Sequence, residues 1–193
     1  MSAPDCCAVL DFWFSAPGSV QYGQSRVEWF KKSDAFDALI RERFLPLYDQ
    51  ARAGTLSKWH DSPLSLMALI IVCDQFPRNL YRDSPRAFET DPTALACARE
   101  MIARGWDRRL HALERQFAYL PFEHAEDLAA QRESMRLFGE LAREHGRDDL
   151  LEWARKHAVI IERFGRFPHR NAVLGRESTP VEVEFLKGPD SRF

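Results

Sequence analysis

One short phrase occurs twice in the chain and concentrates side chains that could bind a ligand. The first copy is DQFPRN, residues 74–79, and the second is GRFPHRN, residues 165–171. Each copy follows an apolar stretch with paired isoleucines and places Arg and Asn shortly after Phe-Pro. We therefore predict that two distant helices end alike and fold back to share one polar cleft.

The guanidinium groups of this cleft are suited to anions. An arginine can bind a carboxylate or a phosphate through two parallel hydrogen bonds, which is the usual reason for several arginines in one place. A structural alternative stays open, because arginines near a helix end bind its last carbonyl groups and an asparagine after a Pro turn bonds local backbone. The residues of the predicted cleft from the two phrases and their flanks are Asp74, Gln75, Arg78, Asn79, Arg82, Arg163, Arg166, His169, Arg170 and Asn171.

A second polar group follows the Leu-Pro-Phe sequence at residues 120–122. His124 titrates near neutral pH, and a carboxylate from Glu123 or Glu126 would fix its tautomer, so this group could act as a general acid or base. If the next helix begins by His124, Gln131 falls within an apolar stripe and needs hydrogen-bond partners. Gln131 then belongs either to a buried structural network or to the lining of a cleft.

Other chemistries find less support. His124, His169, Glu123 and Glu126 are acceptable metal-ligand types, but the chain has neither H-E-x-x-H nor an ordered cysteine set, so we predict no metal and no cofactor. The G-x-S-x-G, P-loop and dinucleotide-binding motifs are also missing from the sequence. With 27 basic and 29 acidic residues the formal net charge is −2, which gives no positive field for nucleic acid.

The cysteines and the N-terminus point to a reducing compartment. Cys6, Cys7, Cys73 and Cys97 show no zinc-like spacing, and the adjacent pair cannot easily bridge, so we expect free thiols and a cytoplasmic protein. The N-terminus has acidic residues in place of a basic leader, and the longest apolar run, residues 64–73, is too short to span a bilayer. We therefore expect no membrane partner.

Hydrophobic periodicity predicts helices almost throughout the chain. Start signals stand at Ser33, Ser62, Asp91 and Thr179, and Pro121 is expected to end a short helix. Pro46 should bend or divide the helix in which it lies, and residues 15–27 should be irregular. The expected helices cover approximately residues 34–54, 63–76, 91–105, 113–120, 124–146, 148–164 and 180–188.

No stretch alternates with period two for long enough to form a strand, so we predict an all-α fold. The 45% hydrophobic and 12% aromatic content is enough for one continuous core, and a single domain is expected over residues 1–193. Short connections favour antiparallel helix hairpins, stacked as in tetratricopeptide-type superhelices.

Several phrases, in this order, resemble a bacterial family catalogued as domain of unknown function 924. They are VLDFWF at 9–14, WF at 29–30, DQFPRNLYR at 74–82, GWD at 105–107, YLPFEH at 119–124, RFGRFPHRN at 163–171 and LGR at 174–176. The resemblance implies an all-helical protein related to tetratricopeptide-type helix pairs, and it implies no reaction. Family members often carry His-Ser-Glu where this chain has His124, Ala125 and Glu126, so no hydroxyl at position 125 is a required nucleophile here.

Two functional hypotheses follow. The first is a binding module whose arginine-rich cleft accepts an acidic peptide or a small anion. The second is a small hydrolase or lyase that uses His124 or His169 as acid and base, Glu123 or Glu126 as the orienting carboxylate, and Arg78 with Arg170 as substrate clamps. A closed pocket with His124 bonded to a carboxylate would favour the enzyme, and a shallow groove lined by Arg and Tyr would favour binding. The oligomeric state is not predicted.

Overall fold

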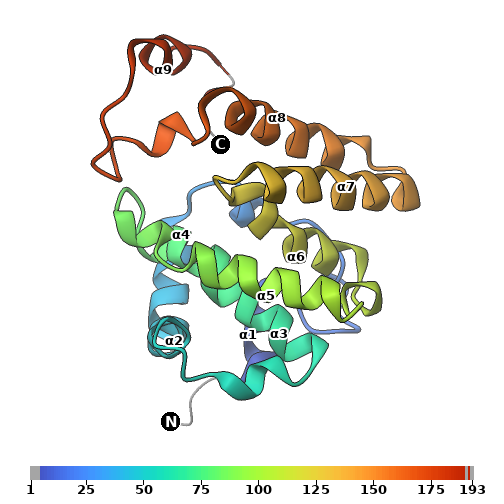
Figure 1. Cartoon of the computed structure of the whole chain (residues 1–193). Coiled ribbons are helices and arrows are strands. Elements are labelled where there is room, and N and C mark those ends of the chain that lie inside the picture. Colours follow the sequence, from blue (N-terminus) through green and yellow to red (C-terminus); the bar gives the residue numbers. More distant parts are fainter. Residues whose placement is uncertain (1–4, 190, 192–193) are drawn as a thin grey trace. The chain divides into compact units, whose positions relative to one another are not determined.

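The structure is a computed structural model that describes residues 5–189 and residue 191 (Figure 1). These residues form helices, turns and irregular segments without any strand, which confirms the all-α prediction. Among them, no helix combines the length and apolar character needed to cross a membrane. The α-helices are α1 (Cys6–Phe14), α2 (Asp34–Arg52), α3 (Pro63–Ile70), α4 (Phe76–Leu80), α5 (Asp91–Ala103), α6 (Ala112–His124), α7 (Leu128–His145), α8 (Asp148–Phe164) and α9 (Pro180–Phe185).

Short helical segments connect or continue these elements. Five are 3₁₀ turns and one, η3, is a π-helix, in which each hydrogen bond spans five residues. They are η1 (Val27–Trp29), η2 (Ser57–His60), η3 (Ile71–Gln75), η4 (Pro85–Phe88), η5 (Asp107–Arg109) and η6 (Pro168–Arg170).

The chain divides into two compact units. Unit 1 comprises Met1–Arg82 and Arg86–Pro121, and unit 2 comprises Asp83–Pro85 and Phe122–Phe193. The single domain over residues 1–193 stays a prediction, as does the tetratricopeptide-like stack.

Local signals set many of the helix ends. Ser33, Ser62 and Thr179 each accept a hydrogen bond from the backbone N–H three residues further on, which caps α2, α3 and α9. Glu182 completes the predicted capping box of α9 by accepting from the backbone of Thr179. Gly146 ends α7 in the left-handed conformation at φ 64°, where a side chain would be strained. Pro46 lies inside α2 without dividing it.

The helix before the first phrase does not stop at Phe76. It passes through η3 into α4, because Pro77 has no N–H for the carbonyl of Cys73 and would clash with that oxygen in a regular helix. In η3 the Phe76 N–H reaches the carbonyl five residues back, and the Thr90 hydroxyl donates to the Cys73 oxygen at 2.6 Å. The proline is therefore accommodated within the helix.

Thr90→Val tests whether the Thr90 hydroxyl stabilises the helix by donating to the Cys73 carbonyl in place of the N–H that Pro77 lacks. We expect a loss of about 1–2 kcal/mol in the free energy of unfolding, because the buried Cys73 carbonyl loses its hydroxyl donor at nearly constant side-chain volume. Thr93→Val on the exposed side of α5 is the matched control. Urea denaturation of both variants measures the difference, and equal stabilities would contradict the assignment.

Two predicted boundaries around residue 121 are wrong. Pro121 does not end α6, which continues to His124. A proline this late in a helix removes only one backbone hydrogen bond, and the surrounding contacts keep the last turn helical. The next helix, α7, begins at Leu128 and is capped by the Asp127 carboxylate. His124 and Gln131 therefore lie on different helices and share no stripe.

The N-terminal VLDFWF phrase forms α1, a helix that the periodicity did not indicate, and supplies the aromatic core of unit 1. Trp13 is 1% exposed and packs against Trp29, Phe36, Phe76 and Phe117 at ring-centroid distances of 5.7–6.0 Å. Phe76 of the first phrase is therefore a core residue, as its type predicts.

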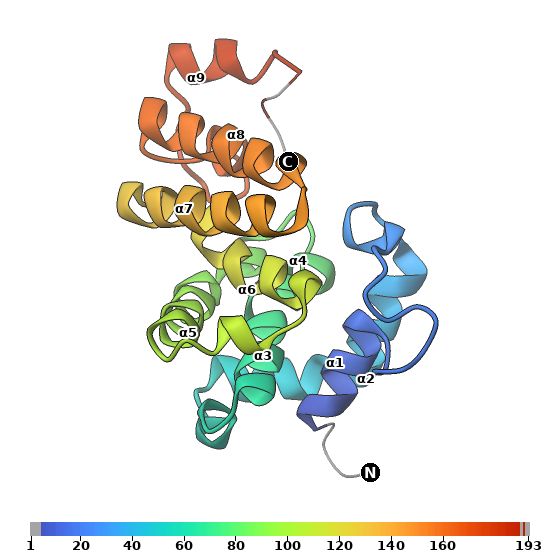
Figure 2. The same ribbon diagram turned by 90° about the vertical axis from the view of Figure 1, so that its right-hand side faces the viewer.

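In unit 2, α7 and α8 form a hairpin. Only Gly146 and Arg147 separate the two helices, which lie side by side in both views (Figures 1 and 2). Beside them, Ile160, Ile161 and Phe167 are buried together, and Phe164 and Phe185 pack against them. The loop that follows α8 is thereby anchored through Phe167 of the second phrase.

Candidate functional site

Arg78 of the first phrase is held by carboxylates of unit 1. Its two terminal nitrogens donate to Asp91, the first residue of α5, at 2.8 and 3.1 Å, and one of them also donates to the Asp74 carbonyl. The Asp74 carboxylate is fully buried and accepts a 2.5 Å hydrogen bond from the Gln75 amide. This arrangement is a fork-shaped ion pair that joins η3 and α4 to the start of α5.

Asn79 and Arg82 share a second carboxylate of unit 1. Asp37, in the first turn of α2, accepts from the Asn79 amide at 2.8 Å and from Arg82 at 2.5 and 2.9 Å. Burial alone would raise the pKa of Asp37, but the hydrogen bonds from Arg82 and Asn79, together with the positive charges of Arg82 and Lys32, lower it overall. These two residues therefore fasten α4 and the turn after it to α2.

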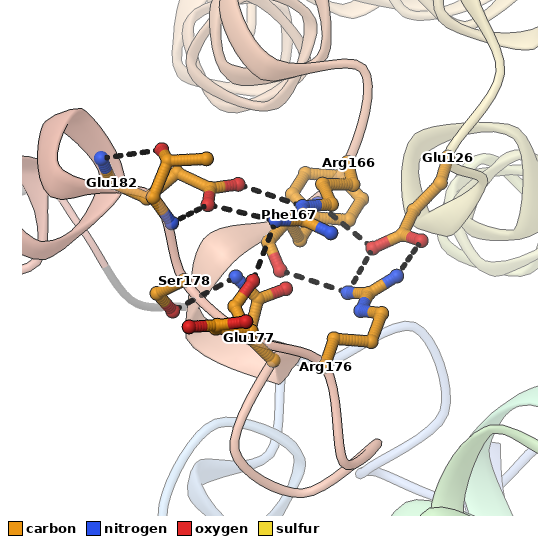
Figure 3. Close-up of polar contacts among 9 residues, drawn as sticks. Glu126, Arg166, Phe167, Arg176, Glu177, Ser178 and Glu182 are labelled. Carbon is orange, nitrogen blue, oxygen red and sulfur yellow. Dashed lines mark hydrogen bonds and ion pairs between the residues drawn. The ribbon is translucent and has the colours of Figure 1, made fainter.

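Arg166 of the second phrase has the same kind of partner in unit 2. It donates to both oxygens of Glu182, in the first turn of α9, at 2.7 and 2.8 Å, and to the Glu177 carbonyl at 2.9 Å (Figure 3). The hydrogen bond from Arg166 is the main reason that the pKa of Glu182 falls to about 2. The pair ties the loop after α8 to α9.

A second set of contacts in unit 2, called the Glu126 bracket below, joins Glu126, Arg176 and Phe167 (Figure 3). The Glu126 carboxylate accepts from Arg176 at 2.6 and 2.9 Å and from the Phe167 N–H at 2.8 Å, while Arg176 also donates to the Phe167 carbonyl at 3.2 Å. Burial would raise the pKa of Glu126, yet the bonds from Arg176 and Phe167 hold it below its usual value. Nearby, the Asn171 amide donates to Ser178 at 3.0 Å.

In unit 2, His157, His169 and Arg170 lie against the Phe167 ring, and His124 lies beside His157. His124 ends α6, His157 lies on α8, and His169 and Arg170 lie in η6. The His157 ring centroid is 6.4 Å from that of His124 and 5.7 Å from that of Phe167. The Phe167 ring is 5.6 Å from His169, and the Arg170 guanidinium carbon lies 4.6 Å from the Phe167 ring centroid. The histidine cluster, as it is called below, consists of His124, His157, His169, Arg170 and Glu123.

His157 is the innermost member of the cluster. Its Nδ1 donates to the Trp153 carbonyl at 2.9 Å, which leaves Nε2 as the acceptor nitrogen, and a Glu123 carboxylate oxygen lies 3.3 Å from the same Nδ1. Burial lowers the pKa of His157 to about 3, and the positive charges of His124, Arg170 and His169 act in the same direction. At neutral pH the contact with Glu123 therefore involves a neutral imidazole and is not an ion pair.

Gln131 holds the turn that carries two members of the cluster. It is 1% exposed, and its amide nitrogen donates to the carbonyls of Phe122, Glu123 and Ala125 at 3.3, 2.8 and 2.8 Å. These carbonyls at the end of α6 have no later helical turn to bond. These contacts agree with the first of the two alternatives for Gln131, which was a buried structural network.

The structure brings together only part of the predicted cleft. Glu123, His124, His169 and Arg170 meet in the histidine cluster, while Arg163 is exposed and stacks on Phe164 and Phe185. Glu126 belongs to the Glu126 bracket, and Arg166 and Asn171 make the other contacts of the loop after α8 that are described above. Asp74, Gln75, Arg78, Asn79 and Arg82 lie in unit 1, so a cleft common to both phrases stays a prediction.

His157 is not among the candidate residues predicted from the sequence. It lies in the expected helix 148–164, and the available signal was a titratable side chain among apolar positions. No group of three or more His, Cys, Asp or Glu in the described part of the chain could hold a metal ion. A depression of about 290 Å³ beside Glu140, Arg143 and Glu144 of α7 includes none of the cluster residues.

The chain is similar to known proteins along almost its whole length. The family model "Bacterial protein of unknown function (DUF924)" matches residues 9–190. The solved structure of a protein of unknown function, ATU0120 from Agrobacterium tumefaciens, shares 39% sequence identity at a TM-score of 0.84, and the match covers 95% of this chain and 97% of that chain. No curated protein matches this chain. The family predicted from the phrases is therefore confirmed, and the chain belongs to the bacterial family of unknown function DUF924.

Proposed function

We propose that unit 2 binds a small anionic ligand at the histidine cluster. The observation that carries the proposal is the convergence of His124, His169 and Arg170 around His157, whose imidazole stays neutral because it is buried and because these neighbours add positive charge. A titratable group with a strongly shifted pKa beside other charged groups is typical of functional sites. A cytoplasmic location remains part of this proposal.

The chemistry of the cluster favours an anion. Arg170 carries N–H donors and a permanent positive charge, and the half-buried His124 and His169 are of a type that can carry both. The nearby Glu126 carboxylate accepts two hydrogen bonds from Arg176, which offsets its negative charge. The cluster holds one carboxylate, Glu123, and three side chains that can carry positive charge, His124, His169 and Arg170, so its balance of charge favours a carboxylate or phosphate.

Burial favours a small anion over an acidic peptide. Arg170 is 7% exposed and His157 is 6% exposed, so a ligand that contacts them must be compact, while His124 and His169 are more exposed. The other arginines of the two phrases bind carboxylates of their own units, which supports the structural alternative for Arg78, Arg82 and Arg166. The proposed site is thus smaller than a cleft lined by both phrases.

Thermal unfolding in the presence of sulfate, phosphate and citrate tests this function. A ligand that binds only the folded state raises the melting temperature with its concentration, and the gain reaches about 2.7 kcal/mol at a hundredfold excess over Kd. Sodium chloride at matched ionic strength controls for general screening. If none of the three anions stabilises the protein beyond chloride, the proposal is wrong.

Substitutions locate the effect. We expect His169→Gln and Arg170→Gln to weaken sulfate binding about tenfold or more, because glutamine donates a hydrogen bond but cannot carry the positive charge, a difference worth about 1.4 kcal/mol. Arg132→Gln on the exposed side of α7 is the matched control and should leave the affinity unchanged. Because Arg170 is buried, the half-buried His169 provides the decisive variant if Arg170→Gln does not fold.

A second candidate is acid–base catalysis at the same cluster. It is favoured by the Glu123 carboxylate, which lies 3.3 Å from His157 Nδ1 with the His124 ring beside it. Glu123 is the orienting carboxylate of this candidate because it lies within the cluster, whereas Glu126 is bound by Arg176. Assays with aryl phosphate and aryl ester substrates test this candidate. It requires a turnover by the parent protein that His124→Gln abolishes, and a parent rate equal to the buffer rate would rule out hydrolysis of these substrates.

A further inference from the structure

We infer that His60, a half-exposed residue of unit 1, is a nucleophile that accepts a phosphoryl group at its Nε2 atom. The inference does not depend on the anion site of unit 2, and it assigns a modification site to unit 1. It rests on the way in which Arg104 and Glu100 hold the His60 ring.

Glu100 connects α5 to η2 and fixes the His60 ring. One of its oxygens lies 2.6 Å from His60 Nδ1, and the other lies 2.7 Å from Arg104 Nη2. Arg104 also donates to the His60 carbonyl at 2.9 Å, and its guanidinium carbon lies 4.5 Å from the Trp106 ring centroid. The carboxylate is therefore held by Arg104 on one side while it orients the imidazole on the other.

The contact with Glu100 decides which nitrogen of the ring can react. A carboxylate that is paired with an arginine only accepts hydrogen bonds, so Nδ1 carries a proton, and in the neutral ring the lone pair lies on Nε2. The His60 side chain is 39% exposed, and no residue in the described part of the chain makes a hydrogen bond to Nε2. A phosphoryl donor in solution can therefore reach the lone pair.

The same carboxylate favours the reaction. When Nε2 forms a bond to phosphorus, positive charge develops on the ring, and Glu100 stabilises that charge through the Nδ1 proton, as the carboxylate of a catalytic triad does. Arg104 and the exposed Lys58, two residues before His60, add positive charge for the phosphoryl group, and the exposed Asp61 opposes them.

The donor is an acyl phosphate or a phosphoramidate. The Nε2 lone pair attacks phosphorus, an N–P bond forms, and the bond from phosphorus to the leaving group breaks. The leaving group departs with the bonding electrons as a carboxylate or as ammonia, and nothing is oxidised or reduced. Nδ1 keeps its proton, so the product is a phosphoryl-imidazolium whose positive ring faces the Glu100 carboxylate.

Potassium phosphoramidate is the probe for this reaction. The full chain is incubated with it at mildly alkaline pH, and mass spectrometry of peptides follows the modification of each histidine with time. We expect His60 to be modified about three to ten times faster than the exposed His145, because a partly exposed carboxylate stabilises the developing charge by an amount of this size. Phosphorus NMR should show that the phosphoryl group is attached to Nε2.

Glu100→Gln is the decisive variant. Glutamine keeps the size of the side chain and still accepts a hydrogen bond from Nδ1, but it carries no charge to stabilise the imidazolium. The rate at His60 should therefore fall to about that of His145, whereas Glu162→Gln on the exposed side of α8 should leave it unchanged. Circular dichroism checks that the variants fold, and Arg104→Gln, which releases Glu100, should lower the rate in the same direction.

The outcomes separate this inference from the anion site. A rate at His60 no higher than that at His145 would overturn the inference and leave the three side chains as a tether between η2 and α5. Attachment at Nδ1, or an unchanged rate in Glu100→Gln, would overturn it as well. None of these results bears on sulfate binding at the histidine cluster, because His60, Glu100 and Arg104 all lie in unit 1.

Discussion

Glu126→Gln is expected to lower the free energy of unfolding by about 2–4 kcal/mol, measured by urea denaturation. Glutamine keeps the size of the side chain but removes the charge that Arg176 meets at 2.6 and 2.9 Å and weakens the acceptor for the Phe167 N–H. Arg176 would then remain partly buried, at 23% side-chain exposure, opposite a neutral amide. Phe167 anchors the second phrase in the core of unit 2, so the loss extends beyond one pair.

Glu133→Gln is the matched control for this prediction. Glu133 also pairs with an arginine through two hydrogen bonds, but its partner Arg136 is 47% exposed on α7. Exposed pairs of this kind contribute about 0.2–0.5 kcal/mol, so the same substitution should cost much less. Equal losses in the two variants would show that the Glu126 bracket is no stronger than an ordinary surface pair.

The second large effect is on the acid stability of the protein and arises from His157. Its pKa in the folded state is about 3, below the value of about 6.5 in the unfolded chain, so at intermediate pH the unfolded state binds a proton that the folded state does not. Stability from this group is therefore complete above about pH 6.5 and is lost as the pH falls toward 3, at about 1.4 kcal/mol per pH unit. Between pH 6.5 and pH 5 the loss amounts to about 2 kcal/mol.

His157→Gln should remove this part of the pH dependence. The variant is expected to be less stable than the parent at neutral pH, because the Trp153 carbonyl contact and the packing against Phe167 change. Its free energy of unfolding should nevertheless fall less steeply between pH 7 and pH 5, a window above the range in which carboxylates titrate. The exposed His145→Gln variant should keep the parent slope. A parent-like slope in His157→Gln would mean that the buried imidazole is charged in the folded protein.

Most of the fold was predictable because its signals are local. Ser33, Ser62 and Gly146 act within one helical turn of their own positions, so sequence alone identifies them. The prolines were different. Pro77 lies in a continuous helix because Thr90, from a distant segment, serves the carbonyl that the proline leaves open, and no local pattern reveals such a partner.

The residue types of the candidate site could be predicted from the sequence, but the residues to which they bind could not. The concentration of arginines in the two phrases was correctly noticed, but the carboxylates that bind them come from elsewhere in the sequence: Asp91 for Arg78 and Glu182 for Arg166. Each of these carboxylates lies at the start of a helix, where negative charge is also favoured by the dipole. A single sequence without its folded contacts cannot assign these pairs.

The histidine cluster shows the same limit. His124, His169 and Arg170 could be selected for their chemistry, whereas His157 shares the buried face of α8 with apolar residues and was not selected. Only the packing of α8 against the end of α6 and the second phrase places it between the other histidines.

The most direct test of the anion site is a sulfate titration followed by NMR, observing the Cε1–Hε1 signal of each of the six histidines. The account predicts that the signals of His124 and His169 move with sulfate to saturation, while those of the exposed His145 and of His60 and His111 in unit 1 match a sodium chloride control. Signals of all six histidines that respond to sulfate only as they respond to chloride would contradict it.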